Sequence, residues 1–568
     1  MHRLDRHARP LAFRPRTRPL PAALLSLSLA ALTLGQTSWA QSSTVSPTDA
    51  PAMATLQVAR IVVEGVGEHP ASGISQAAID AIANQTLRDI SPTLPAALNF
   101  EQIQQITARI TQAYRDAGFL VSVVYIPPQQ VNDSQTLTLK VMEGRVGRVL
   151  VQGSQRYRED QLTASSLGLI GRPLRRNELD RALLYARDLP GVSVTSVLQA
   201  GQNPGETDIV LVATDNARPY EITAGLSNHG TDSTGKYRAE LGISAFNALG
   251  AGDVLAASIG YGLDPADSWQ AALSLSVPSA QVQGLSAIAG VSRSEMELNT
   301  GPLAALEING PTTMFYAGSD WKFIQRADLQ VQASARWIHE QSRLDGLGML
   351  LSRHTFDVID AGLSLRHTDR RWRGMNLAQV SLRKSINDES SPQNWLYTSH
   401  EPYFWVGRLN LARLQALPGN QRLWLRGSAQ FTQDALTPLE QFSVGGPTSV
   451  RAYPLSTALG DRGVQATFEY QLSAPGFADT PSPFNGRRWG DLVDVNLFYD
   501  WGRTSPAADN RRLGVLPTTL EGAGIGLGLR LPWKPELQLE ASAARPTGSQ
   551  PGNDQRRTQF WARISTTF

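Results

Sequence analysis

The sequence of 568 residues contains no cysteine. This absence excludes disulfide bonds, thiolate metal sites and the covalent attachment of haem through cysteine. A chain bound for an oxidising compartment loses little by omitting thiols. Beyond residue 40 the sequence also lacks any run of about 18 apolar residues, and its mean hydropathy is −0.22. A membrane protein built from helices is therefore excluded, whereas alternating membrane strands remain possible because hydropathy plots miss them.

A large net charge is missing as well. The whole chain carries 52 basic and 50 acidic residues. Without the first 40 residues, which hold six Arg and one Asp, the balance is 46 to 49 and the net charge is −3. Nucleic-acid-binding domains are strongly basic, so we expect no nucleic-acid partner.

The N-terminus has the parts of an export signal. Six arginines precede an apolar stretch over Ala22–Gly35, and Ser38 and Ala40 supply small residues for cleavage. This pattern predicts a Sec-type signal peptide over residues 1–40. The alternative, a transmembrane anchor, is disfavoured because the apolar stretch is short. Residues 41–55 are rich in Ser, Thr, Pro and Ala and predict a flexible linker.

Two similar units follow, over residues 56–144 and 145–216. Each predicts the order β-α-α-β-β, a small sheet with two helices on one face. In the first unit we expect strands at 56–64, 119–126 and 136–142, and helices at 75–87 and from Asn99. In the second we expect strands at 146–151, 192–198 and 208–213, and helices at 159–168 and from Asn177.

The helix from Asn99 has the clearest local signals. Asn99 and Gln102 have the spacing of a capping box. Ile103 and Ile106 begin an apolar stripe at helical spacing, and Gly118 predicts the end of the helix.

From 217 to 568 helical periodicity gives way to alternation of apolar and polar residues, as in Leu329–Trp337. A soluble sandwich also alternates, but Trp269, Trp337 and Phe431 end apolar faces, where the aromatic girdle of a membrane barrel would lie. Roughly sixteen such stretches occur between turn signals, and an even number is typical of bacterial barrels. The predicted fold is therefore a membrane β-barrel of about 16 antiparallel strands preceded by two periplasmic domains.

The last ten residues, Gln559–Phe568, alternate in the same way. Phe560 and Phe568 lie on the apolar face, so we expect the barrel-closing strand here, with the two aromatics as its assembly signal.

Two segments carry the candidate site. In the strand Asp491–Arg503, alternation directs Asp500 into the barrel, and a buried carboxylate needs a partner. The glycine- and proline-containing segment around 442–462 predicts a loop that folds inward and presents Arg451. We expect Arg451 to bind Asp500 bidentately. The simpler alternatives are a solvated loop arginine and a pore-lining carboxylate.

A family resemblance rests on Val450, Arg451, Ala452 and Tyr453 in the loop and on Phe498, Asp500 and Gly502 in the strand. The first four resemble the Val-Arg-Gly-Tyr tip of the plug loop in the superfamily of outer-membrane insertases and secretion transporters; the last three resemble its inward strand motif. Two repeats before a sixteen-stranded barrel are similar to the two-partner secretion transporters (TpsB), typified by those for filamentous haemagglutinin and haemolysin.

The resemblance implies that the repeats are POTRA domains in the periplasm and that the barrel lies in the outer membrane, in contact with its lipid. It implies secretion of an unfolded, β-helical partner exoprotein without ATP, and the barrel-assembly machinery as a partner for the chain's own insertion. Ala452 departs from the usual glycine of the loop tip. Residues 41–55 are also too short and proline-rich to supply the plug helix of better-studied members.

Period-two glycines from Gly522 to Gly528 superficially suggest a nucleotide-binding turn. They lie on one face of a strand, which instead predicts a closely packed loop inside the barrel. No catalytic constellation is found, so neither an enzymatic activity nor a cofactor nor a metal is expected.

Client binding is predicted by β-augmentation in the first repeat. The candidate strand residues are Phe119, Val121, Val123 and Tyr125, and Ile103 and Ile106 are the candidates for an adjoining groove. The alternative is that this strand is central and only structural. Three rival functions remain: an insertase of the same superfamily, which usually carries more repeats; a passive porin, which needs none; and a TonB-dependent receptor, which needs a larger barrel.

Overall fold

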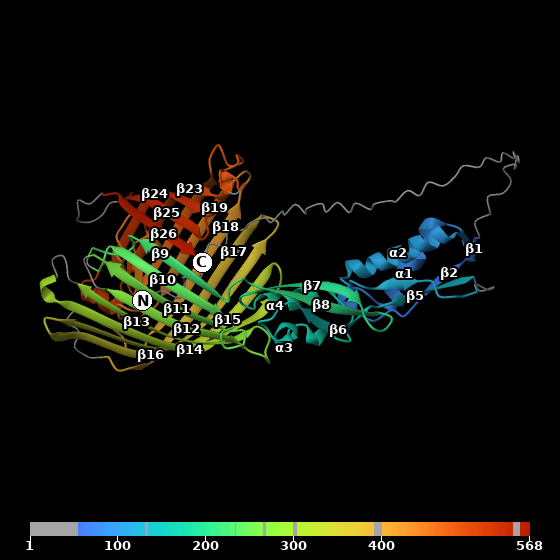
Figure 1. Ribbon diagram of the computed structural model, residues 1–568, viewed down its shortest axis with the longest axis horizontal. Coiled ribbons are helices and arrows are strands. Elements are labelled where there is room, and N and C mark those ends of the chain that lie inside the picture. The colour runs from blue at the N-terminus through green and yellow to red at the C-terminus, as the bar shows by residue number, and fades with distance from the viewer. Residues whose placement is uncertain are drawn as a thin grey trace, which may run out of the picture.

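The computed structural model shows two small domains in a row, leading into a large barrel (Figure 1). The residues that it describes are 55–130, 135–232, 234–264, 268–298, 304–390, 400–484, 486–548 and 557–568. The predicted signal peptide and nearly all of the predicted linker lie outside the described residues.

The first domain has a three-stranded sheet with the order β2-β5-β4, two helices and a separate two-stranded pair, β1-β3. Its elements are β1 (Leu56–Val58), β2 (Arg60–Glu64), α1 (Gln76–Ile90), β3 (Ala96–Leu98), α2 (Phe100–Asp116), β4 (Val123–Tyr125) and β5 (Thr136–Met142). The Asn99–Gln102 capping box is present, and Gly118 follows α2 with a left-handed φ of 91°. The short β1-β3 pair was not predicted.

The second domain repeats the sheet, with the order β6-β8-β7. Its elements are β6 (Arg145–Gln152), α3 (Glu159–Thr163), α4 (Arg176–Arg187), β7 (Val192–Ala200) and β8 (Glu206–Asp215). Two sequence predictions were wrong in detail: α3 is a single short turn followed by a 3-10 turn, and the N-cap position of α4 is Arg175, without a side-chain capping bond, rather than Asn177.

Within the described residues, sixteen antiparallel strands close into one barrel, which confirms the predicted fold class. The strands are β9 (Tyr220–Ser227), β10 (Tyr237–Phe246), β11 (Val254–Leu263), β12 (Trp269–Pro278), β13 (Leu285–Leu298), β14 (Ile308–Gln325), β15 (Leu329–Gly346), β16 (Met349–Asp369), β17 (Gly374–Asp388), β18 (Trp405–Ala416), β19 (Gln421–Phe431), β22 (Arg462–Ser473), β23 (Val493–Ser505), β24 (Thr518–Leu531), β25 (Glu536–Pro546) and β26 (Gln559–Thr567). Strand β26 pairs with β9, where Arg563 lies opposite Ser227, and completes the circle.

The remaining elements lie in connections. They are the strands β20 (Phe442–Val444) and β21 (Ala458–Gly460), the helix α5 (Ala508–Arg512), and 3-10 turns at Pro70–Ser72, Leu167–Leu169, Ala304–Leu306 and Trp489–Asp491.

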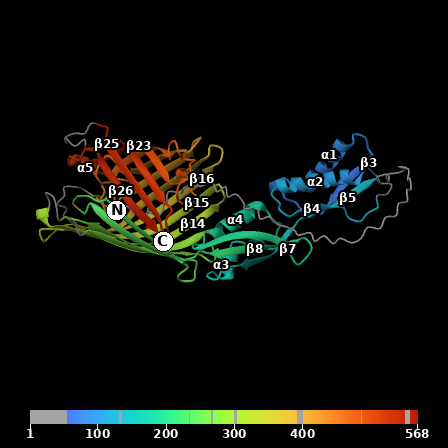
Figure 2. The ribbon, with the colours of Figure 1, turned by 45° about the horizontal axis from the view of Figure 1, so that its top comes forward.

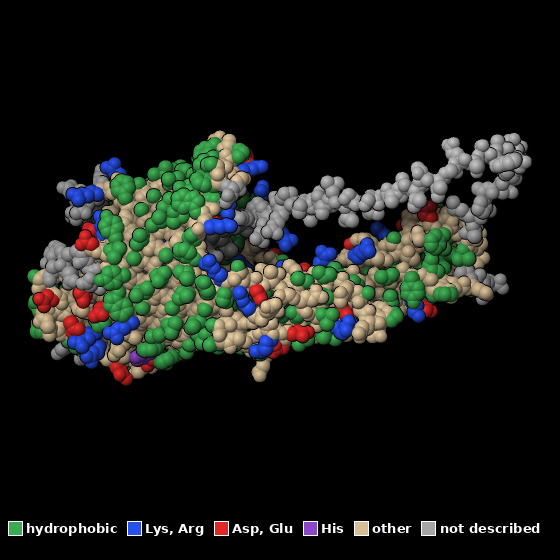
Figure 3. Space-filling view, viewed as in Figure 1, with side chains coloured by type: hydrophobic (Ala, Val, Ile, Leu, Met, Phe, Trp, Pro, Cys, Tyr) green, Lys and Arg blue, Asp and Glu red, His purple; other side chains and the backbone are tan. Residues whose placement is uncertain are grey.

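Alternation along the strands gives the barrel two different faces. Hydrophobic side chains spread over the outer wall, while charged ones gather toward the two ends (Figure 3). Phe560 is 67% exposed and lies on this outer wall, whereas its neighbour Trp561 points inward and is 6% exposed. No helix among the described residues is long and apolar enough to cross a membrane.

The second domain is docked on the turns at one end of the barrel (Figure 2). Tyr185 Oη donates to the carbonyl of Lys322 at 2.8 Å, and Lys322 Nζ lies 2.7 Å from Asp188 Oδ2. Gln161 Nε2 donates to the carbonyl of Gly250 at 2.9 Å. These contacts involve the turn after β10 and the end of β14, and since the strands alternate in direction, all turns at this end share one side of the membrane.

Candidate functional site inside the barrel

The chain between β19 and β22 does not stay outside the barrel but folds back into it. Its β20-β21 hairpin packs on β22 and β23. Gly445 and Gly446 have φ values of 110° and 103°, a left-handed conformation that glycine adopts without strain, and they bend the chain inward. The tip of this inward loop carries Arg451.

Arg451 makes the predicted contact with Asp500. Its Nε donates to Asp500 Oδ2 at 2.8 Å, its Nη2 to Oδ1 at 2.9 Å, and its backbone N–H to Oδ2 at 3.1 Å. The Arg451 side chain is 8% exposed and that of Asp500 is 1% exposed. This bidentate, charge-assisted geometry fixes the guanidinium in one plane.

A second carboxylate, which was not predicted, completes the ion cluster. Arg451 Nη1 donates to Glu469 Oε2 on β22 at 2.9 Å, and Asn496 donates to the other oxygen at 2.7 Å. Arg426 lies 3.6 Å from Glu469. Two arginines therefore face two carboxylates, and the cluster balances its own charge.

Two aromatic side chains hold the arginine from other sides. The Arg451 Cζ lies 3.3 Å from the centre of the Phe498 ring, a cation–π contact. Trp561 Nε1 on β26 donates to the carbonyl of Arg451 at 2.7 Å. Trp561 was not predicted as a site residue, although it is the one aromatic on the polar face of the last strand. That mismatch is the signal that could have identified it.

Glycines on the inner wall make room for the loop. A Cβ on Gly522 would lie 2.2 Å from the Cβ of Ala452, and one on Gly502 would lie 2.6 Å from Val444. The predicted role of the glycine stripe, close packing of an inward loop, is confirmed at Gly522. A Cβ on Gly524 would in turn lie 2.4 Å from the Phe498 ring that supports Arg451.

The other residues of the loop motif are buried as well. Val450, Ala452 and Tyr453 are 0%, 2% and 5% exposed and share one apolar cluster with Phe498. Ala452 is not among the residues with a left-handed φ, so the usual glycine is not required there. The structure thus brings all seven motif residues together, while their role in transport stays a prediction.

The loop is also fastened away from its tip. Arg383 Nη1 on β17 and Arg408 Nη2 on β18 donate to Glu440 Oε2 at 3.0 and 2.7 Å. The buried carboxylate of Asp461 accepts from the backbone N–H groups of Leu436 and Ala507 at 2.8 and 2.6 Å. Sequence alternation alone gave no reason to pair residues this far apart in the chain.

The client-binding candidates fall into two groups. Phe119, Ile103 and Ile106 are 2%, 7% and 0% exposed and belong to the core of the first domain, so their prediction as contact residues was wrong. A buried apolar stripe at helical spacing signals the core, not a groove.

Two of the strand residues are instead accessible. Val123 and Tyr125 are 49% and 41% exposed, and their strand β4 is an edge of the sheet, not its centre. Val121 lies before β4 and packs against the core of the second domain. The predicted strand over 119–126 is therefore shorter: only Val123–Tyr125 join the sheet, and Phe119 instead forms an isolated bridge with Arg175.

Among the described residues, no group of three His, Asp or Glu side chains is placed to hold a metal ion. The buried charges of the lumen instead pair with one another, and their arrangement fastens a loop. Together with the barrel and the two preceding domains, this defines a membrane β-barrel protein of the POTRA-and-barrel class.

Comparison with known proteins gives the family. The chain belongs to the haemolysin secretion/activation protein family ShlB/FhaC/HecB, whose sequence model matches residues 205–531. A ShlB-type POTRA domain model matches residues 69–144.

Curated relatives span most of the chain. The haemolysin transporter protein ShlB of Serratia marcescens is 24% identical over 517 residues, covering 88% of this chain and 86% of its own. The haem/hemopexin transporter protein HuxB of Haemophilus influenzae is 22% identical over 487 residues, covering 83% and 82%. Among solved structures, CdiB from Escherichia coli aligns with a TM-score of 0.66 at 19% identity, covering 92% and 93%.

Proposed function

We propose that this outer-membrane transporter passes one partner exoprotein, unfolded in the periplasm, through its barrel, and that the Arg451 loop closes the lumen until the client arrives. The observation that carries the proposal is the loop itself. Its tip is held in the lumen by an arginine shared between two carboxylates of the barrel wall, Asp500 on β23 and Glu469 on β22. A cluster of hydrogen-bonded charges can exchange its partners for water or for a client, which a purely apolar plug cannot do as readily.

Client capture is assigned to β4. An edge strand presents unpaired backbone groups that an extended chain can join. Replacing Val123 and Tyr125 by Lys should reduce secretion several-fold, because charged side chains on an edge oppose strand addition. Secreted client is measured against barrel level. The matched control is Val197→Lys on β7, the exposed edge strand of the second domain. Equal losses in both variants would remove β4 as the specific site.

The proposal includes the domain boundaries near residues 144 and 216. They are supported by short connections: β5 ends at Met142 and β6 begins at Arg145, while β8 ends at Asp215 and β9 begins at Tyr220. It also includes dependence on the barrel-assembly machinery, for which Phe560 on the closing strand and Phe568 directly after it are the candidate signal. Truncating Phe568 should lower the amount of folded barrel in the outer membrane.

The test of the function is quantitative proteomics of the culture supernatant and the outer membrane, with and without the gene. A dedicated transporter predicts the loss of one large exoprotein from the medium while other barrels keep their levels. A collective fall of outer-membrane barrels would instead identify an insertase. The client is the exoprotein that returns to the medium when the gene is supplied again.

A further inference from the structure

The turn between β16 and β17 concentrates positive charge at the end of the barrel where the second domain docks. Arg370, Arg371 and Arg373 are exposed, and Trp372 between them is 64% exposed. Within the part of the chain that the structure describes, no carboxylate lies within 4 Å of these three guanidinium groups. A cationic turn with an exposed indole at the end of a membrane strand combines the two features that favour the headgroup region.

The backbone of this turn is held in place from both sides. Asp369 Oδ1 accepts from the Trp372 backbone N–H at 3.0 Å, and Arg413 Nη2 on β18 donates to Asp369 Oδ2 at 3.3 Å. The N–H of Ala416 donates to the carbonyl of Arg373 at 3.0 Å. The Asp369 charge is thus used by Arg413, and the three turn arginines project from an ordered backbone.

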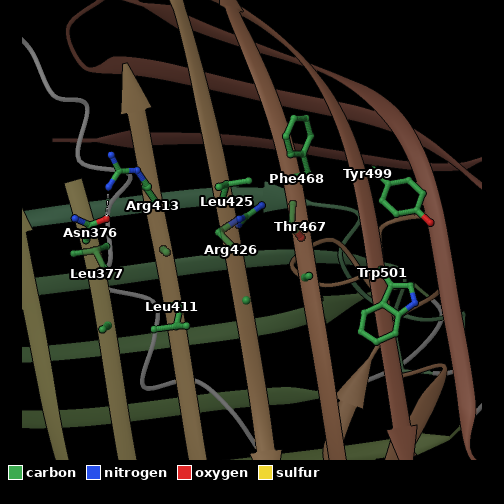
Figure 4. Close-up of a pocket in the computed structure, with 14 residues that line it drawn as sticks. Asn376, Leu377, Leu411, Arg413, Leu425, Arg426, Thr467, Phe468, Tyr499 and Trp501 are labelled. Carbon is green, nitrogen blue, oxygen red and sulfur yellow. Dashed lines mark hydrogen bonds between the residues drawn. The ribbon is translucent and has the colours of Figure 1, made fainter. Parts of the chain in front are cut away.

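An apolar groove adjoins the same turn on the outer wall. It has a volume of about 660 Å³ and crosses β17, β18, β19, β22 and β23. Small residues such as Gly427 and Ala466 form its floor, and Leu425 and Phe468 stand beside them. Figure 4 shows Arg413 toward the end of β18 and Asn376 on the neighbouring strand β17, with Trp501 at the far end of the groove.

The groove faces away from the lumen. Leu425, Phe468 and Tyr499 lie opposite one another in the ladder and are 38%, 49% and 41% exposed. Their neighbours in sequence, Glu469 and Asp500, belong to the inward ion cluster. Since successive strand residues point to opposite faces, the groove lies on the lipid side.

We propose that this turn and groove bind one anionic phospholipid of the periplasmic leaflet. Its phosphate lies among Arg370, Arg371 and Arg373, Trp372 rests at the depth of the glycerol backbone, and an acyl chain enters the groove past Arg413. Charge complementarity selects an anionic headgroup. The position of the turn, on the side where the periplasmic domain docks, selects the leaflet.

The test is native mass spectrometry of the full chain in mild detergent, titrated with phosphatidylglycerol and, separately, with phosphatidylethanolamine. The wild type should prefer phosphatidylglycerol. The triple variant R370Q/R371Q/R373Q should lose on the order of a hundredfold in affinity for it, since each surface arginine contributes about 1 kcal/mol, roughly a fivefold factor, to binding an anionic lipid. Correct folding is checked by heat-modifiable mobility in electrophoresis.

A second variant tests the groove. A Cβ at Gly427 would meet only the carbonyl oxygen of Gln465, at 3.7 Å, so Gly427→Leu fills the groove from outside without disturbing the wall. This variant should bind both lipids more weakly than the wild type does. The charge-matched control R503Q/R511Q/R512Q removes three arginines from the opposite end of the barrel and should bind as the wild type does.

Three results would overturn the proposal. They are unchanged lipid affinity in the triple turn variant, an equal loss in the control variant, and unchanged affinity in Gly427→Leu. If the turn variant keeps its lipid but fails to secrete client, the arginines contact an acidic client segment instead, and the lipid site is rejected.

Discussion

At the scale of single residues, the ion cluster has an asymmetry that determines how it responds to mutation. Arg451 contacts both Asp500 and Glu469, whereas each carboxylate has further support: Glu469 from Asn496 and Arg426, and Asp500 from the backbone N–H of Arg451 itself. Loss of Arg451 leaves two buried carboxylates with one arginine. Loss of either carboxylate still leaves the Arg451 guanidinium with the other carboxylate as a partner.

We therefore expect Arg451→Ala to release the loop more completely than Asp500→Asn. Breaking a buried ion pair costs about 3–5 kcal/mol, and less in a hydrated lumen. Arg451→Lys should recover little, because an ammonium cannot form the bidentate contact. The measurements are channel conductance in planar bilayers and secreted client, with barrel abundance as the control. Closed, fully secreting channels in both alanine and lysine variants would show that the cluster does not close the lumen.

The charge exchange, Arg451→Asp with Asp500→Arg, gives a finer test. The new carboxylate would face Glu469, so only part of the function should return. Adding Glu469→Gln should improve the rescue.

A second residue-scale prediction concerns packing. Gly522→Ala places a methyl group in the space of the Ala452 side chain, and the loop tip must move. Combining it with Ala452→Gly should restore closure, because the two changes exchange one methyl group across the contact. A double-mutant cycle on channel conductance measures the coupling. Additive effects would mean that the contact does not position the loop.

The limits of prediction at this scale are clear from the same site. Arg451 and Asp500 could be found because each stands in a short recognisable motif. Glu469 had no such motif, and the unusual place of Trp561 on a polar face did not reveal its partner, since only the strand register and barrel closure bring β22 and β26 to the loop tip. A period-two pattern gives the face of a residue but not its neighbour across the lumen.

At the scale of elements, the strands and long helices followed directly from periodicity, and the errors occurred where the signal is short. The β1-β3 pair contains three residues in each strand, too few for a pattern to appear. The strand predicted over 119–126 failed at its start because Phe119 is turned into the core beside Tyr114, at a ring distance of 5.4 Å. Tertiary packing there overrides the local preference for strand.

The second periplasmic domain contains an ion pair that joins two strands and makes the stability of the domain depend on pH. Arg148 Nε donates to the fully buried Asp208 at 3.1 Å, joining β6 to β8. This hydrogen bond holds the pKa of the Asp208 carboxyl below its usual value. The carboxylate therefore stabilises the fold above the ordinary pKa of about 4, and that stability is lost as the pH falls through the lowered pKa.

We expect Asp208→Asn to speed hydrogen exchange in β6 and β8 at pH 7, and the difference from the wild type to shrink progressively as the pH falls below about 4 and through the lowered pKa of Asp208. Hydrogen exchange of the full chain, compared between the two proteins at each pH, cancels the intrinsic pH dependence. A difference that persists unchanged at low pH would assign the effect to packing rather than charge.

At the scale of the whole molecule, the second domain and the loop act on different parts of the barrel wall. The domain docks on the turn that follows β10 and on the end of β14, while the loop tip contacts β22, β23 and β26. The arrangement separates an anchored part of the wall from the part that holds the loop. The number of strands and the tandem of domains could be predicted from sequence, but this division could not, because it depends on turn-to-domain contacts.

We predict that covalently fixing the docked domain leaves secretion intact. Ser165 and Gln283 lie in contact across the docking surface, where Gln283 Nε2 donates to the carbonyl of Ser165 at 3.4 Å. The chain has no cysteine, so Ser165→Cys with Gln283→Cys creates one unique pair for a short bifunctional maleimide. Secretion is measured before and after cross-linking, with the single-cysteine variants as controls. Arrest only in the cross-linked pair would show that the domain must leave the barrel during transport.

The hydrogen bond from the Trp561 indole gives the loop a second structural role. Strand β26 meets β9 in five residue pairs, against nine with β25, so the joint that completes the circle is the shorter of its two. Because Trp561 holds the loop tip to β26, the loop links the last strand to β22 and β23 across the lumen. On the proposed function, a client that releases the loop removes this link in the same step, and β26 is then held by its pairing with β25 and by its shorter pairing with β9. We expect the barrel wall to be most deformable at that moment, when the client passes.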